Sequence, residues 1–324
     1  MAFTYDWDLV IMSVIVAMMA SYVALDLAGR VTATEGRAGR YWLLGGALAM
    51  GAGIWSMHFI GMLAVQMPIP LGYDPLLTAT SLVIAIVTSG FALALVSRKS
   101  LGVSALLLGG AVMGAGISGM HYAGMAAMEM YPPIRYQPLV FAISIAIAVS
   151  ASVAALWLAF TLRAAASRRA GMAKILAAGA MGIAISGMHY IGMAAARFAP
   201  DSVCKAAIRL SEDNSYLGHG IGVMVLLLLG MTLLSSIFDA RLGARTARML
   251  AQLRESEEKY RALLETTTDA VLLVDETGTI RFANPSVSTV FGYQPQELSG
   301  KPLEMLQPES LREQHRQGLK RYLE

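Results

Sequence analysis

Long apolar stretches separated by short charged loops fill the first three quarters of the chain. About 20 consecutive apolar residues span the hydrocarbon core of a bilayer as a helix, and seven stretches meet this length. They cover roughly residues 8–28, 42–65, 75–97, 102–128, 138–162, 173–196 and 217–238. No basic head with a small-residue cleavage site precedes the first stretch, so we expect it to be a retained helix. The pattern predicts an all-α membrane domain with seven transmembrane helices.

Composition agrees with a membrane protein. Hydrophobic residues make up 56% of the chain, charged residues 15%, and the mean hydropathy is +0.57, which excludes an ordinary soluble domain for most of it. The net charge is only +3, and no basic stripe points to nucleic acid. We therefore expect the lipid bilayer to be a partner and nucleic acid not to be one.

Lys and Arg are distributed unevenly between the short loops. The loops after spans 1, 3 and 5 carry nine of them, whereas the loops after spans 2, 4 and 6 carry four. Positive residues collect on the cytoplasmic side, so the first set of loops is predicted to face the cytoplasm. The N-terminus is then outside, and the segment from Asp239 onward is cytoplasmic.

One six-residue motif occurs three times, each time near the end of an apolar stretch. It reads Met-His-Phe-Ile-Gly-Met at 57–62, Met-His-Tyr-Ala-Gly-Met at 120–125 and Met-His-Tyr-Ile-Gly-Met at 188–193. The copies are about two spans apart, so the helices that carry them run in the same direction and place the copies at one depth. We expect three pseudo-repeats that share one site near the outer surface.

Each motif brings an imidazole and two thioethers into the membrane, where polar groups are costly unless something binds them. On a helix, the histidine and the second methionine lie one turn apart on one face. Convergence of the three helices would give an imidazole layer and, about 6 Å nearer the outer surface, a thioether layer. The predicted ligands are His58, His121 and His189 with Met62, Met125 and Met193. The first methionines, Met57, Met120 and Met188, point about 100° away and are second-choice ligands.

The donor set favours copper. Thioethers suit Cu(I), and imidazole suits copper in either oxidation state. The competing interpretation is structural: methionine is a common apolar filler, and an intramembrane histidine often bonds a neighbouring carbonyl.

The segment 241–260 is charged and has helical periodicity. Its apolar stripe recurs at alternating intervals of four and three, as in a coiled coil. The positions are Leu242, Thr246, Met249, Leu253, Ser256, Tyr260 and Leu263. We expect a signalling helix that forms a homodimer together with the domain that follows it, the alternative being a monomeric amphipathic linker.

From residue 261 to 324 the composition is that of a soluble α+β fold. Two short strands with a turn at Glu276, Thr277 and Gly278 are followed by Phe282-Ala-Asn-Pro285 and Phe291-Gly-Tyr293. This order resembles a PAS domain. Because a PAS fold has three further strands after its last helix, we expect a partial PAS domain here.

Glu313-Gln-His315, followed by Tyr322 and Leu323, resembles the helix that supplies the haem-binding histidine in oxygen-sensing PAS kinases. The resemblance implies a haem held by His315. Many PAS domains without haem also carry a histidine on this surface, so a haem-free PAS domain is the alternative.

The triple Met-His-[Tyr/Phe]-x-Gly-Met repeat across residues 1–240 resembles the MHYT domain, a bacterial membrane sensor module. The resemblance implies copper bound near the periplasmic face of the inner membrane, a diatomic gas ligand (oxygen, carbon monoxide or nitric oxide), and a cyclic di-GMP cyclase or phosphodiesterase further along the full-length protein. The first motif departs from the pattern, with Phe59 where the others have Tyr122 and Tyr190.

Two other functions compete with a sensory receptor. A copper transporter or relay would use the same ligands, but all three motifs lie at one depth, and we expect no second soft-ligand layer toward the cytoplasm. A haem-binding membrane sensor would use histidines as axial ligands, yet haem normally takes two and would leave one of the three unexplained. No phosphate loop, catalytic triad or paired carboxylates appear in the sequence, so we expect no enzyme activity in this chain.

Overall fold

The fold is described from a computed structural model, which covers residues 3–34, 36–163, 168–210 and 217–323. The chain divides into two compact units, Met1–Asp239 and Ala240–Glu324.

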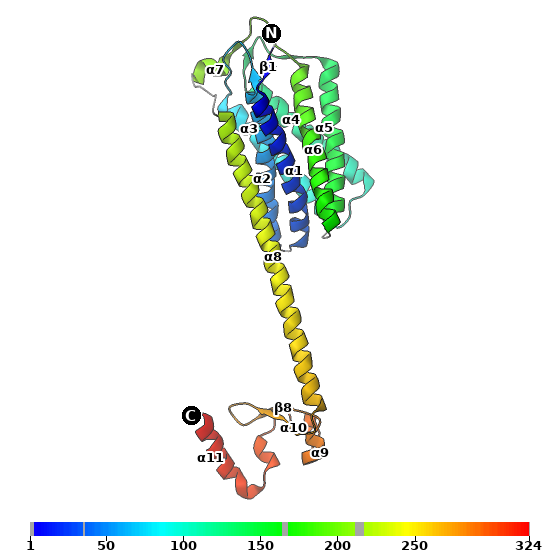
Figure 1. The fold of residues 1–324 in the computed structure, drawn as a ribbon, viewed down its shortest axis with the longest axis vertical. Helices are drawn as coiled ribbons and strands as arrows, with labels where there is room; N and C mark the ends of the chain where they lie inside the picture. The colour runs from blue at the N-terminus through cyan, green and yellow to red at the C-terminus, as the bar shows by residue number, and fades with distance from the viewer. Residues whose placement is uncertain (1–2, 35, 164–167, 211–216, 324) are drawn as a thin grey trace. The chain divides into compact units, whose positions relative to one another are not determined.

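Within the described ranges, seven helices are long and apolar enough to cross a membrane, as the sequence predicts. They are α1 (Trp7–Ala33), α2 (Gly36–Leu63), α3 (Pro75–Val96), α4 (Val103–Ala126), α5 (Pro138–Leu162), α6 (Arg168–Ala195) and α8 (Leu217–Thr266). Helices α1 to α6 lie side by side in the first unit (Figure 1). The chain is a multi-pass membrane protein.

Consecutive helices form three hairpins, α1–α2, α3–α4 and α5–α6, each closed by the same backbone hydrogen bond. In each, the amide just before the first helix donates to a carbonyl at or just after the end of the second. The three bonds are Asp6 N to Ala64 O (2.8 Å), Asp74 N to Ala127 O (2.7 Å) and Gln137 N to Ala195 O (2.9 Å). The sequence repeat is therefore a structural repeat of helical hairpins.

Short antiparallel strand pairs join the loops at this end of the hairpins, where the short helix α7 (Lys205–Leu210) also lies (Figure 1). The pairs are β1 (Thr4–Tyr5) with β2 (Val65–Gln66), β3 (Met130–Tyr131) with β6 (Val203–Cys204), and β4 (Arg135–Tyr136) with β5 (Ala196–Arg197). Burial is the main cause that raises the pKa of Tyr5 and of Tyr136 to about 12. Both phenols therefore stay neutral at physiological pH.

Side-chain hydrogen bonds connect each hairpin to the next. Tyr190 on α6 bonds Ser13 on α1 (2.8 Å), and Tyr122 on α4 bonds Ser144 on α5 (2.6 Å). The third bond cannot come from Phe59, which has no hydroxyl.

Trp55 makes the third bond instead. Its indole Nε1 donates to Ser81 of α3 at 2.9 Å, and its ring stacks on Phe59 with centroids 5.0 Å apart. The first repeat thus keeps the link between hairpins with a different donor, so the departure from tyrosine at position 59 leaves this part of the fold complete.

Glycines let the repeat-bearing helices α2, α4 and α6 approach the outer helices closely. A Cβ atom added to Gly51 would lie 2.5 Å from backbone of α3, at Gly114 it would lie 2.6 Å from backbone of α5, and at Gly182 it would meet Met18 of α1 at 2.6 Å. The three close approaches occupy equivalent positions of the repeats. At these three positions glycine therefore allows the close packing of neighbouring helices.

Helix α8 also contacts the bundle through a polar cluster. Arg30 of α1 forms an ion pair with Asp239 of α8 (Nη1–Oδ2 3.0 Å), and its Nε lies 3.8 Å from Asp26. Ser236 of α8 hydrogen-bonds both Arg30 and Asp26. Asp26 is therefore part of a polar link between α1 and α8.

Helix α8 does not end where the apolar stretch ends. It is continuous from residue 217 to 266, whereas the sequence suggested a span and a separate signalling helix. The apolar members of the predicted coiled-coil stripe are all exposed, between 53% and 67% for Leu242, Met249, Leu253, Tyr260 and Leu263.

In the second unit, the predicted hairpin is present as β7 (Leu272–Val274) and β8 (Ile280–Ala283), which pair antiparallel. Short helices follow: α9 (Val287–Phe291), α10 (Pro295–Leu298), 3-10 turns at 303–306 and 309–311, and α11 (Arg312–Leu323). Ile280, Val287 and Leu298 form its buried core. The buried Asn284 donates to the carbonyls of Leu264 (2.9 Å) and Asp269 (2.8 Å) and so joins the end of α8 to the hairpin.

Candidate metal centre

The three motif histidines meet inside the bundle. His58 on α2, His121 on α4 and His189 on α6 are each at most 1% exposed. The Nδ1 atoms form a triangle with sides of 3.1 Å (His58 to His121), 3.1 Å (His58 to His189) and 3.3 Å (His121 to His189). Each histidine lies five or six residues before the end of its helix, so the triangle lies about 8 Å below those ends.

Hydrogen bonding among the imidazoles cannot satisfy this triangle. A neutral imidazole Nδ1 carries either one proton or one lone pair in the plane of the ring. With three such atoms in mutual contact, at least one pair must therefore present two protons or two lone pairs to each other. A cation between the three lone pairs removes this conflict, since all three Nδ1 atoms can then be ligands.

The dimensions of the triangle fit such an ion. A point equidistant from the three Nδ1 atoms lies about 1.8 Å from each of them, close to a metal–imidazole bond of about 2.0 Å. A small outward movement of the rings, or an ion slightly out of their plane, brings the two lengths together. The three histidines could hold a metal ion.

The glycine of each motif makes room for a histidine of another motif. A Cβ added to Gly124 would lie 2.1 Å from Nε2 of His58, at Gly192 it would lie 2.4 Å from Nε2 of His121, and at Gly61 it would lie 2.3 Å from Nε2 of His189. The Nε2 atoms have no hydrogen-bond partner within the described residues. Histidine and glycine therefore recur together because each ring packs directly against a backbone without a side chain.

The second methionines of the motifs lie together. Met62, Met125 and Met193 are each at most 1% exposed and belong to one apolar cluster with Phe59 and Tyr73. This cluster includes residues of the closing loops, so the three thioethers lie on the loop side of the histidines. The arrangement is the one that a thioether layer beside the imidazole layer requires, although their role as ligands stays a prediction.

The first methionines are equally buried but do not share one cluster. Met57 and Met188 pack in the main core of the bundle, whereas Met120 packs with Ile54 and Ala85. They remain second-choice ligands.

A second methionine layer lies on the opposite side of the histidines. Met50, Met113 and Met181 occupy equivalent positions and line the same two cavities inside the bundle. The expectation that no further soft-ligand layer continues in this direction is therefore wrong. The signal was present in the sequence, because a methionine stands eight residues before each motif histidine.

The remaining histidines lie apart from this centre. His219 is exposed on α8. His315 is partly exposed on α11, and its Nδ1 is buried without a hydrogen-bond partner in the described part of the chain. The side chains of Tyr322 and Leu323, which belong to the haem-PAS resemblance, lie outside what the structure describes. Haem at His315 stays a prediction.

Comparison with known families accounts for both parts of the chain. The family model for MHYT, described as a bacterial signalling protein N-terminal repeat, matches residues 1–40, 51–109, 114–172 and 182–247. The PAS fold matches residues 258–324. Neither is a catalytic domain. No solved structure matches the chain.

Several relatives are signalling proteins. The bifunctional diguanylate cyclase/cyclic di-GMP phosphodiesterase MucR of Pseudomonas aeruginosa is 51% identical over 79% of this chain and 37% of its own length. The signaling protein YkoW of Bacillus subtilis is 35% identical over 87% and 34%, and the cyclic di-GMP phosphodiesterase NbdA of P. aeruginosa is 38% identical over 68% and 28%. The chain thus spans about a third of the length of these relatives. It belongs to the MHYT family of bacterial signalling proteins, and its membrane repeats are followed by a PAS domain.

Proposed function

We propose that this chain is the sensory part of a bacterial inner-membrane receptor that binds copper at the histidine triangle and responds to a diatomic gas or to redox state. The observation that carries the proposal is the meeting of three buried imidazole Nδ1 atoms within 3.1 to 3.3 Å. Family membership supports a signalling role, and the buried methionines on both sides of the triangle support a soft metal.

Copper suits this environment better than zinc. Zinc has little use for thioether ligands, whereas Cu(I) accepts both imidazole and thioether. Copper also changes oxidation state and, as Cu(I), binds small molecules such as oxygen or carbon monoxide. Ligands Met62, Met125 and Met193 would complete the set on the loop side, which the distribution of Lys and Arg assigns to the periplasm.

The polar link at the other end of the bundle gives the signal a route. A change in the packing of α2, α4 and α6 reaches α1 through the hairpin contacts, and Arg30 connects α1 to Asp239 of α8. Helix α8 then continues to the PAS hairpin, where Asn284 holds its last turn. The exposed stripe on α8 suits a homodimer, because a coiled coil buries the a and d positions against a second copy.

The output is proposed to lie beyond this chain. MucR and NbdA carry cyclic di-GMP activities in their names, and the chain corresponds to about a third of their length. A cyclic di-GMP cyclase or phosphodiesterase in the full-length protein, on the cytoplasmic side, is therefore the proposed effector.

Metal analysis of the purified protein tests the site. We expect about one copper per chain in the wild type, and loss of copper in a variant with His58, His121 and His189 all changed to alanine. His219→Ala is the matched control, since this histidine is exposed and lies away from the triangle. Copper retained by the triple variant, or lost equally in the control, would show that the assignment is wrong.

The second methionine layer favours one alternative, a copper relay across the membrane. A relay requires soft ligands in succession, and Met50, Met113 and Met181 supply a further set. Proteoliposomes loaded with a Cu(I)-binding dye separate the two functions, because a sensor transports no copper and a relay does.

Haem in the membrane part is less compatible with the geometry. Two axial imidazoles on one haem iron hold their ligating atoms on the order of 4 Å apart, which is two metal–nitrogen bonds of about 2 Å. The Nδ1 atoms here are 3.1 to 3.3 Å apart and leave no space for a porphyrin between them. Absence of a Soret band in the purified protein would exclude haem.

A further inference from the structure

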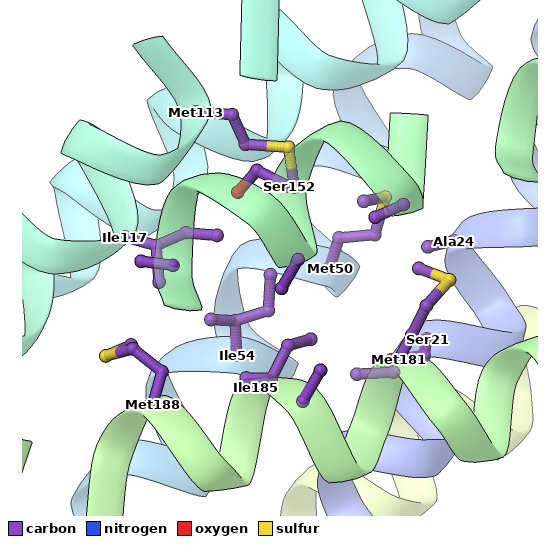
Figure 2. Close-up of a pocket in the computed structure, with 15 residues that line it drawn as sticks. Ser21, Ala24, Met50, Ile54, Met113, Ile117, Ser152, Met181, Ile185 and Met188 are labelled. Carbon is purple, nitrogen blue, oxygen red and sulfur yellow. The ribbon is translucent and has the colours of Figure 1, made fainter. Parts of the chain in front are cut away.

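A small cavity lies in the bundle on the far side of the histidines from the closing loops. Its volume is about 40 Å³. Figure 2 shows the side chains around it, which come from α1, α2, α4, α5 and α6. Three isoleucines and three methionines at equivalent positions of the repeat helices line it: Ile54, Ile117 and Ile185, with Met50, Met113 and Met181.

The isoleucines place the cavity next to the proposed metal centre. Each stands four residues before a motif histidine, which is one helical turn on the same side of its helix. Met188, which directly precedes His189, also lines the cavity. The space therefore lies about one helical turn from the imidazole triangle, between the three helices that carry the motifs and helices α1 and α5.

The lining favours an apolar occupant over water. Apart from Ser21 and Ser152, the side chains around the space are those of Ala, Ile and Met. Ser21 already donates to the carbonyl of Ala17 at 2.8 Å, whereas the hydroxyl of Ser152 has no partner among the described residues. A buried water needs two to four polar partners, and cavities without them stay dry and take up apolar gases such as xenon.

The volume limits the size of the occupant. By the same measure one water needs about 10 to 15 Å³, so the cavity has room for a molecule of two or three heavy atoms. Drug-sized ligands occupy pockets of about 300 to 1,000 Å³ and do not fit. A second cavity of about 30 Å³ lies beyond Met50, Met113 and Met181, which line both, so the three methionines separate the two spaces.

We propose that the first cavity is a binding site for a small apolar molecule of the dioxygen class, held one helical turn from the histidine triangle. The role of the bound molecule rests on the proposed function: it would be the gas that the metal centre detects, held beside that centre. The existence of the binding site does not depend on the proposed function. Apolar gases reach the site through the lipid and the small-residue helix interfaces without an aqueous channel.

Xenon tests the site directly, because it reports an apolar cavity without metal, gas chemistry or enzyme activity. Crystals of the wild-type protein pressurised with xenon should show an anomalous peak bounded by Ile54, Ile117 and Ile185. The same cavity should contain no ordered water before pressurisation. A wild-type cavity that holds water, or stays without xenon while xenon binds elsewhere in the bundle, would overturn the proposal.

Two alanines on α5 provide matched variants. Ala148 lines the first cavity alone and Ala159 the second cavity alone, and both are buried. Ala148→Leu should abolish the xenon peak, and Ala159→Leu should retain it; Ala148→Val is the smaller change if leucine prevents folding. An undiminished peak in both Ala148 variants would refute the assignment.

Metal content measured on the same samples keeps this proposal separate from the proposed function. Xenon lost from Ala148→Leu with wild-type copper retained supports the cavity as a distinct site. Xenon bound by a wild-type protein that binds no copper would refute the proposed function and leave the cavity assignment standing. Copper bound by a wild-type protein that takes up no xenon would refute the cavity assignment and leave the proposed function standing.

Discussion

The glycines behind the histidines allow the geometry of the centre to be tested by adding a single methyl group. In Gly124→Ala, the new Cβ would lie 2.1 Å from Nε2 of His58. Ordinary contact begins at 3.4 Å, so the ring of His58 must move by about 1.3 Å. Metal–ligand distances in working sites vary by only about 0.2 Å, so a shift of this size removes one ligand from the triangle.

The expected result is a loss of metal affinity in a protein that still folds. Second-shell changes that disturb ligand orientation commonly lower metal affinity about 10- to 100-fold, and Gly124→Ala should reach or exceed that range. A Cu(I) titration against a competing chelator measures the dissociation constant. Thermal unfolding without metal measures stability, which should fall by about 1 to 3 kcal/mol, the usual cost of adding a methyl group to a packed interior.

Gly119→Ala is the control on the same helix. A Cβ at Gly119 meets no atom within 4 Å in the part of the chain that the structure describes. The change should leave copper affinity as in the wild type and raise helix stability by up to about 1 kcal/mol, the difference in propensity between alanine and glycine. Wild-type affinity in Gly124→Ala, or equal losses in both variants, would refute the reasoning.

Three further predictions concern the links within each unit. Tyr122→Phe removes the hydrogen bond to Ser144 and should lower the free energy of unfolding by about 1 kcal/mol in a denaturation series, since the serine is buried; no change would contradict a stabilising link. Asn284→Ala removes three side-chain hydrogen bonds and should destabilise the PAS unit by about 2 to 3 kcal/mol, which thermal unfolding would show. Hydrogen bonds from Thr277 are the main cause that lowers the pKa of Asp275 to about 2. The PAS turn should therefore keep this stabilisation above pH 3.8 and lose it as pH falls through about 2, an effect that Asp275→Asn should abolish in a pH series of unfolding measurements.

The sequence predicts the features that depend on apolar length and on the repeated six-residue motif. Apolar length defines the seven helices, and the Met-His-x-x-Gly-Met spacing defines a shared site at one depth, because helices two spans apart run in the same direction. The meeting of His58, His121 and His189 within 3.3 Å is consistent with that expectation. The glycine of the motif was visible as a repeated residue, but its contact with the histidine of another helix was not, since sequence spacing says nothing about which helices touch.

Other parts of the site depend on packing that a single sequence does not display. Ser13, Ser81 and Ser144 stand at equivalent positions of the outer helices, but isolated serines in apolar helices have no distinctive pattern. Their role follows from the tyrosine or tryptophan that the neighbouring hairpin supplies. The continuity of α8 was missed for a different reason. The residues become charged after Asp239, which marks the end of the apolar stretch but not of the helix. No Pro stands there, and Gly243 lies within the helix and does not end it.

X-ray absorption at the copper edge of the purified, copper-loaded protein tests the central claim most directly. The histidine triangle predicts a first shell of about three imidazole nitrogens near 2.0 Å, with the outer-shell scattering of the rings, and a loss of this shell in the triple histidine variant. A sulfur shell that disappears when Met62, Met125 and Met193 are changed to leucine would identify the thioether ligands. A copper spectrum without imidazole scattering, or one that the triple histidine variant leaves unchanged, would contradict the account.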